Sequence, residues 1–229
     1  LAELGRMAAE VAHDLRNPLG AIRLYAGMLQ QELTDDRRQL ADSVVRGLDT
    51  LESITYNLLS LARPIKPSFQ SVDIVELMKD VIIYTKHAMV ENNVVLVENY
   101  TQHLVCHGDF EQLKQVFLNI ILNAIQAMPD GGNLSLTSSI DEQKELLVFC
   151  VEDNGCGIPQ DIQDKIFTPF FTSKPSGSGL GLHTVNRVIE AHFGRIRVDS
   201  QEGQGTRFYI ELPIDARQNQ PPVFEVGQM

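Results

Sequence analysis

A regular repeat of apolar residues in the first 62 positions is the strongest constraint on the fold. Apolar side chains recur at alternating steps of four and three from Leu4 to Leu29, and again from Leu40 to Leu61. A repeat of 3.5 residues is typical of helices that pack along a shared seam. The polar residues 34–36 supply a short turn and an N-cap for the second helix. A single hairpin cannot bury both apolar stripes, so we expect two copies of the chain to dimerise as a four-helix bundle.

The remainder of the chain mixes helices with strands and predicts an α+β domain with its own core. The proline-containing stretch 63–68 ends the second helix and forms a linker. We therefore divide the chain into a helical hairpin (1–66), an α+β domain (67–215) and a loosely held tail (216–229). The residue pattern predicts helices over 73–90, 109–128 and 180–192, strands near 93–98, 133–140, 146–152, 195–200 and 205–212, and a Gly/Pro/Ser-rich stretch over 153–179.

Charge and composition exclude several classes of protein. The net charge of −11 disfavours nucleic-acid binding, which needs basic patches. No apolar run is long enough to span a membrane. The three cysteines have no metal-ligand spacing, which indicates a reducing compartment and a cytoplasmic location. Because the chain starts without Met or a signal pattern, we expect a fragment of a protein whose missing N-terminal part could anchor it to a membrane.

His13 begins the first cluster of polar residues. It lies about 200° around the helix from Val11, a residue of the apolar seam, and therefore faces solvent. Asp14 offers a carboxylate for the Nδ1 proton of a histidine, which leaves Nε2 as a nucleophile. Asn17 lies one turn further on, and Pro18 bends the helix beside the histidine. The alternative is a kinked structural helix with a solvated polar face.

A second polar cluster lies on the helix predicted over 109–128. Gln115, Asn119 and Asn123 recur every four residues, opposite the apolar stripe. Asn is unfavourable in the middle of a helix, so the repeat requires a reason. One reason is Mg²⁺, which an amide oxygen could hold together with phosphate oxygens and waters. A solvated polar face explains this helix equally well.

Two glycine-rich stretches follow. Residues 153–159 begin with Asp153 directly after an apolar strand, where a carboxylate could accept a hydrogen bond from an exocyclic amine such as that of adenine. Residues 177–182 open a helix, where backbone N–H groups and the helix dipole favour phosphate. An ordinary turn and a flexible loop explain the two stretches as well when each is considered alone.

The combination and order of these motifs decide between the alternatives. The chain resembles the sensor histidine kinases along nearly its whole length up to about residue 213, and chance agreement of six ordered motifs is remote. Residues 12–19 (AHDLRNPL) and 170–175 look most like the nitrogen-regulation branch of that family. In chain order the motifs are His13-Asp14-x-x-Asn17-Pro18, Asn119-x-x-x-Asn123, Asp153-x-Gly155-x-Gly157, Phe167 with Phe170-Phe171, Gly177-x-Gly179-Leu180-Gly181-Leu182 and Gly203-x-Gly205-Thr206.

The resemblance implies a dimerising hairpin followed by an ATP-binding α/β sandwich of the GHKL or Bergerat type, the fold of gyrase and MutL. His13 would be the phosphoacceptor, Asp14 its general base, and Asn17 would position water for dephosphorylation of the partner. The partner would be the receiver domain of a response regulator, acting in trans, with its Asp as the final acceptor. Phosphoryl transfer of this kind depends mainly on positioning and charge neutralisation.

The resemblance also assigns the nucleotide site for ATP and Mg²⁺. Asn123 would hold Mg²⁺ and Asn119 would support the phosphates. Asp153 would bind the adenine amine with help from Thr206, and Lys174 would reach the phosphates. The residues that would shape the pocket and its mobile lid are Gly155, Gly157, Ile158, Gly177, Gly179, Leu180, Gly181 and Leu182.

Two other classes of function stay open on sequence grounds. One is an ATPase of the same fold in which ATP drives a clamp, although such a protein needs neither the His13 motif nor the hairpin. The other is a dimeric scaffold without catalysis that binds a regulator. The intact glycines, Asn123 and His13 argue against the scaffold.

Overall fold

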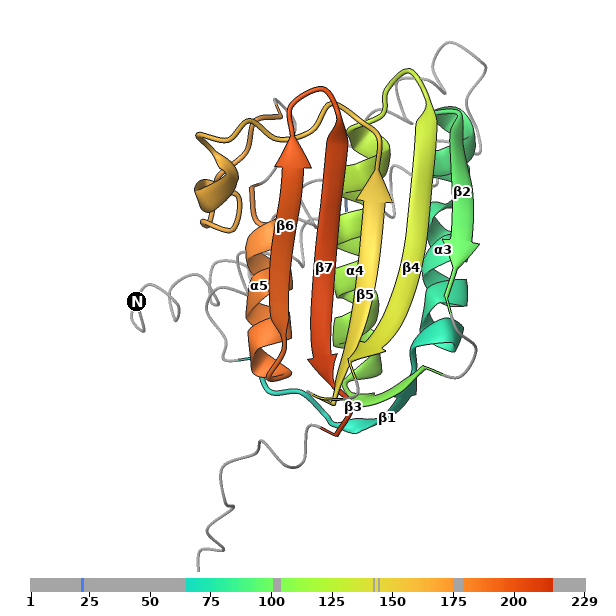
Figure 1. Ribbon diagram of the computed structural model, residues 1–229, viewed down its shortest axis with the longest axis vertical. Coiled ribbons are helices and arrows are strands. Elements are labelled where there is room, and N and C mark those ends of the chain that lie inside the picture. Colours follow the sequence, from blue (N-terminus) through green and yellow to red (C-terminus); the bar gives the residue numbers. More distant parts are fainter. Residues whose placement is uncertain are drawn as a thin grey trace, which may run out of the picture.

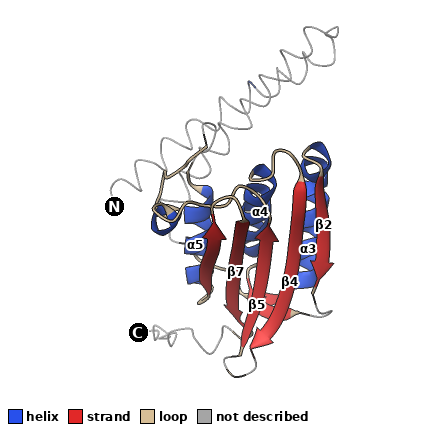
Figure 2. Cartoon of the chain, turned by 45° about the horizontal axis from the view of Figure 1, so that its top comes forward, coloured by secondary structure: helices blue, strands red, loops and turns tan. Residues whose placement is uncertain are grey.

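The computed structural model of the chain describes Ile22 and residues 65–100, 104–141, 143, 145–174 and 179–215. The predicted hairpin, His13, Asp14, Asn17, Gly177 and the tail lie outside the described residues, except for Ile22, which is helical. The described region is α+β: a five-stranded sheet carries three helices on one face, as Figure 1 and Figure 2 show.

The sheet is mixed, and its strands do not follow chain order. In space the order is β2-β4-β5-β7-β6. The pairing of β2 with β4 is parallel and every other neighbouring pair is antiparallel. The last strand in sequence, β7, therefore lies inside the sheet. The bounds are β2 Val94–Asn99, β4 Gly132–Asp141, β5 Leu146–Asp153, β6 Arg195–Gln201 and β7 Gly205–Pro213.

Three helices cover the inner face of this sheet: α3 (Ile74–Glu91), α4 (Phe110–Gln126) and α5 (Gly181–Ala191). The side chains of Asp73 and Asp109 cap the first two by accepting backbone N–H groups of the first turn. The apolar stripe predicted on α4 is buried as expected. Its centre is Phe117, whose ring meets that of Phe149 on β5 edge-on, with centroids 5.0 Å apart.

All the helices and strands predicted in the described region are present, with ends shifted by one or two residues. Two strands were not predicted: β1 (Gln70–Asp73) and β3 (Val105–Gly108) form a separate two-stranded antiparallel sheet. Each has four residues, too few to show an alternating pattern. Pairing with the other strand stabilises each of them, and that pairing spans more than 30 positions of the chain.

The described end of the linker is docked against this small sheet and the N-terminus of α4. The amide of Ser68 donates to Oδ2 of Asp109 at 2.8 Å. The ring of Phe69 stacks on His107, at 5.4 Å between centroids, and packs against His192 and Phe193. Residues 68 and 69 therefore belong structurally to the α+β unit.

Candidate functional site

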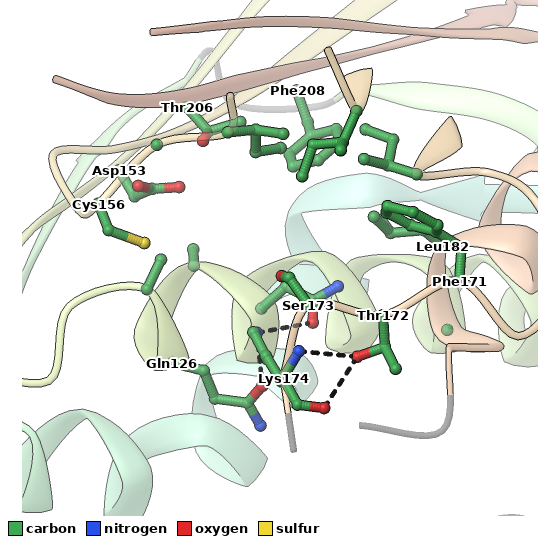
Figure 3. Close-up of a pocket in the computed structure, with 18 of the residues that line it drawn as sticks. Gln126, Asp153, Cys156, Phe171, Thr172, Ser173, Lys174, Leu182, Thr206 and Phe208 are labelled. Atoms are coloured by element: carbon green, nitrogen blue, oxygen red, sulfur yellow. Dashed lines mark hydrogen bonds between the residues drawn. The ribbon is translucent and has the colours of Figure 1, made fainter. Parts of the chain in front are cut away.

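A pocket of about 340 Å³ opens at the end of the sheet where β5 stops. Its walls come from the C-terminal half of α4, the loop after β5, residues 166–174, the start of α5 and the first residues of β7 (Figure 3). The predicted binding residues that line it are Asn119, Asn123, Asp153, Gly157, Ile158, Lys174, Gly179, Gly181, Leu182 and Thr206.

The strand pattern of β5 places a carboxylate in the pocket. Alternate residues of β5 face the helices, and Asp153 is the last of this buried set, with 4% of its surface exposed. Thr206 of β7 lies directly opposite in the register and is also buried. Burial raises the pKa of Asp153, whereas hydrogen bonds from the backbone of Gly155 and Thr206 and the charge of Lys174 lower it. The carboxyl group therefore accepts hydrogen bonds from two backbone groups and also faces the pocket, where it can accept one from a ligand.

The loop after Asp153 lies on the end of α4. The amide of Gly155 donates to Oδ1 of Asp153 at 2.9 Å, and that of Cys156 donates to the carbonyl of Ala127 at 3.0 Å. A Cβ atom on Gly155 would lie 2.4 Å from the same carbonyl oxygen. Gly155 therefore permits the loop to approach α4 and does not itself line the pocket.

Gly157 permits a second close approach, toward β6. Its φ is +67°, and a Cβ atom there would lie 2.1 Å from the carbonyl oxygen of Gln201. The hydroxyl of Ser200 accepts the amide N–H of Ile158 and lies 2.9 Å from Oγ1 of Thr206. Ser200 thus fixes the position of two pocket residues. Ser200 could not be predicted as a site residue, because nothing in the sequence distinguishes it from an ordinary strand serine.

The wall formed by α4 is polar. Asn119, Asn123 and Gln126 face the pocket or its rim, and the side-chain amide of Gln115 donates to Oδ1 of Asn119 at 3.4 Å. Lys174 contacts this wall through its ammonium group. Its Nζ lies 2.8 Å from Oε1 of Gln126 and 3.4 Å from Oδ1 of Asn123. Figure 3 shows Lys174 and Gln126 across the pocket from Asp153 and Thr206.

The segment before Lys174 lies close to residues 179–183 at two points. His183 in the first turn of α5 lies with Nδ1 3.0 Å from the carbonyl oxygen of Phe167. Phe170 adopts φ +65°, and a Cβ atom on Gly179 would lie 2.4 Å from its carbonyl carbon. The predicted residue Leu180 is buried and does not line the pocket, because it packs inward at the start of α5.

Family models match the two parts of the chain separately. The model "His Kinase A (phospho-acceptor) domain" matches residues 3–66, and the model "Histidine kinase-, DNA gyrase B-, and HSP90-like ATPase" matches residues 108–216. The chain belongs to the histidine kinases. The first match covers His13, which the sequence analysis named as phosphoacceptor, and the second covers the whole pocket wall from α4 to β7.

Characterised histidine kinases resemble this kinase over most of its length. The signal transduction histidine-protein kinase AtoS of Escherichia coli (strain K12) is 40% identical over 223 residues, which is 96% of this chain and 36% of AtoS. Sporulation kinase E of Bacillus subtilis (strain 168) is 35% identical, over 94% of this chain and 29% of that protein. The chain thus spans about a third of the length of these relatives. The more specific resemblance to the nitrogen-regulation branch stays a prediction.

Solved structures of histidine kinases share the fold. Full-length ShkA, in complex with AMPPNP, matches 91% of this kinase with a TM-score of 0.78 and 28% identity, over 45% of its own chain. ThkA, in complex with the response regulator protein TrrA, matches 94% of it with a TM-score of 0.68 and 26% identity, over 63% of its own chain. In the described part of this kinase, no helix is long and apolar enough to cross a membrane.

Proposed function

We propose that this chain binds ATP with Mg²⁺, transfers the γ-phosphoryl group to His13, and passes it to an aspartate of a response regulator. One observation carries the proposal: the pocket combines a buried carboxylate at one side with a cation and two amide oxygens at the other. A carboxylate suits an adenine amine, and an ammonium group suits phosphates. The complex of the relative ShkA with AMPPNP, an ATP analogue, supports the assignment.

The residues of the α4 wall fit a magnesium ion. Oδ1 of Asn123 faces a cation already, since the ammonium group of Lys174 lies 3.4 Å from it. A single amide oxygen suits Mg²⁺ when phosphate oxygens and waters supply the remaining ligands. In the described residues no group of three or more acidic, His or Cys side chains could hold a metal without the nucleotide. Bound in this way, the ion would neutralise phosphate charge during the transfer.

The proposed transfer assigns a role to each residue of the His13 motif. Nε2 of His13 would attack the γ-phosphorus, so that an N–P bond forms, the bond to the bridging oxygen breaks, and ADP leaves. Asp14 would hold the Nδ1 proton and stabilise the positive charge that develops on the ring. Lys174, whose ammonium group lies beside Asn123 and Gln126, would balance charge on the phosphates.

The phosphoryl group would then leave for a regulator in trans. The complex of the relative ThkA with TrrA supports a response regulator as the kind of partner. The phosphoacceptor match over residues 3–66, together with the apolar seam, supports a homodimer formed through the hairpin. Asn17 would position water for hydrolysis of the regulator's phosphoryl group, which would add a phosphatase activity.

Labelling with ATP tests the proposal. The chain is incubated with Mg²⁺ and γ-labelled ATP, and the labelled protein is treated with acid and with alkali. We expect label that is lost in acid, kept in alkali, absent from His13→Ala, and absent from Asn123→Asp although that variant still dimerises. Full labelling of Asn123→Asp would contradict the Mg²⁺ assignment.

The same experiment separates the two other functions. Production of ADP without label on the protein would favour an ATP-driven clamp. Absence of nucleotide binding would favour a scaffold that only binds the regulator. The carboxylate of Asp153 argues against the scaffold, because a buried charge without a ligand carries a free-energy cost.

A further inference from the structure

The environment of Lys174 is unusual for a lysine, because its ammonium group is held by amide oxygens. Nζ lies between Oε1 of Gln126, at 2.8 Å, and Oδ1 of Asn123, at 3.4 Å. These two acceptors are three residues apart and share one face of α4. Both are neutral, so they orient the ammonium group without cancelling its charge.

In the described part of the chain, no carboxylate contacts this ammonium group directly. Among the residues that the structure describes, none forms an ion pair with Lys174, and Asp153 acts on it only through space. Burial lowers the pKa of Lys174, which indicates partial removal from water. A partly desolvated cation that forms no described ion pair favours an anion in the pocket.

The backbone of Lys174 is fixed as well. Its amide donates to Oγ1 of Thr172 at 3.0 Å, and the same hydroxyl group donates to its carbonyl at 3.2 Å (Figure 3). The remaining freedom lies in the four-carbon side chain, and its end is held by Gln126 at the shorter of the two distances. Gln126 is therefore the residue that determines where the charge sits.

Asn123 cannot take over this task when nucleotide is bound. If its oxygen turns to a magnesium ion, an ammonium group at the same oxygen would meet a second positive charge, and Coulomb repulsion would move it away. Gln126 lies one turn further along α4 and can keep its contact. We propose that Gln126 is a positioning residue, which holds the ammonium group of Lys174 over the pocket so that its charge meets the phosphates of the nucleotide.

This inference rests on the proposed ATP function and can be tested separately from it. Binding of AMPPNP with Mg²⁺, and of adenosine alone, is measured by calorimetry on the full chain. The variants are Gln126→Met, Lys174→Met and the double variant, with Gln204→Met as a matched control on an exposed glutamine outside the pocket. Because Gln126 is exposed at the rim, the Met variant should fold normally.

We expect Gln126→Met to weaken AMPPNP binding about 3- to 10-fold, the effect of one hydrogen bond to a charged group that is partly exposed. Adenosine binding should not change, because it lacks phosphates. The double variant should bind AMPPNP no more weakly than Lys174→Met alone, since without Lys174 there is nothing to position. Gln126→Glu should bind more weakly than Gln126→Met, because a carboxylate pairs with the ammonium group and repels phosphate.

Three outcomes would overturn the inference: unchanged AMPPNP binding by Gln126→Met, an equal loss of adenosine binding, or additive losses in the double variant. Failure of the unaltered chain to bind AMPPNP at all would instead overturn the proposed function, and the inference with it. If the unaltered chain and Gln204→Met bind AMPPNP normally and any of these three outcomes is found, the role of Gln126 is rejected. The proposed ATP function is then unaffected.

Discussion

The backbone amide of Asp109 donates a 2.9 Å hydrogen bond to Nε2 of His192, a residue 83 positions further along the chain. The other ring nitrogen, Nδ1, lies 2.7 Å from the carbonyl oxygen of Val188. A ring that accepts at Nε2 must carry its proton on Nδ1, so His192 is neutral in this arrangement. The bond joins the N-terminus of α4 to the C-terminus of α5, and the side chain of Asp109 extends the connection to Ser68.

Stability should therefore depend on pH through His192. Burial lowers its pKa below the usual 6.5, although the contact with Val188 and the charge of Asp109 oppose the shift. As the pH falls below about 6.5, the unfolded chain takes up a proton that the folded chain does not. We expect the free energy of unfolding to fall by up to about 1.4 kcal/mol per pH unit between pH 6.5 and the lower folded pKa. Urea denaturation over this range measures it.

His192→Gln is the control for this prediction, because it removes the titrating ring and keeps a side-chain acceptor. It should be less stable at pH 7.5, by about 1–3 kcal/mol, through the imperfect replacement of a buried hydrogen bond. Its free energy of unfolding should also depend less on pH than that of the unaltered chain. Equal slopes for the two proteins would show that the pH dependence does not come from His192.

Asp153→Asn should separate stability from binding. Burial raises the pKa of Asp153, so a neutral amide of the same shape avoids the cost of a buried charge, but it offers one acceptor oxygen to the backbone donors of Gly155 and Thr206 where the carboxylate offers two. The two effects oppose each other, and we expect the free energy of unfolding to change by less than about 1 kcal/mol. Oδ1 of Asn can still accept the amide of Gly155. AMPPNP affinity should fall about 10- to 100-fold, because a hydrogen bond to a charged acceptor is lost. A clear loss of stability, or unchanged affinity, would contradict the role of Asp153.

Gly157 and Gly203 form a matched pair for the effect of crowding. Both have positive φ, +67° and +76°, but a Cβ atom on Gly203 would meet no heavy atom within 4 Å. Gly203→Ala should therefore cost about 1–2 kcal/mol for the backbone conformation alone. Gly157→Ala should cost more than about 1 kcal/mol beyond that and weaken AMPPNP binding, because the loop must leave Gln201. The free energy of unfolding of both variants is measured by thermal unfolding. Similar losses for Gly157→Ala and Gly203→Ala would show that the loop relieves the crowding at Gly157 easily.

Asn17→Ala should separate the two activities proposed for the His13 motif. We expect autophosphorylation to continue, because neither the nucleophile nor the pocket is changed. Release of phosphate from a regulator that this chain has phosphorylated should fall severalfold or more, because water loses its positioning residue. Phosphate release from the labelled regulator over time measures this, with His13→Ala as the reference without transfer. Survival of both activities would make Asn17 an ordinary helix residue.

The sequence was informative where a short pattern determines local structure. The apolar run in residues 146–152 predicts the strand that places Asp153 in the pocket, and the stripe on residues 109–128 correctly predicts the buried face of α4. Contacts between distant segments were beyond such reasoning. Gln126 and Lys174 are 48 positions apart, and only the folded chain brings them together. The same holds for Ser200 and for the pairing of β1 with β3.

The internal position of β7 also has a consequence for synthesis. The ribosome produces β5 first, and the strand that lies beside it begins 52 positions after Asp153, at Gly205. At a synthesis rate of roughly 5–20 residues per second, one edge of β5 stays unpaired for about 3–10 s. The apolar side chains of Leu147, Phe149 and Val151 lack their final neighbours during that interval. A nascent chain at this stage is a natural client for chaperones that bind exposed apolar strands.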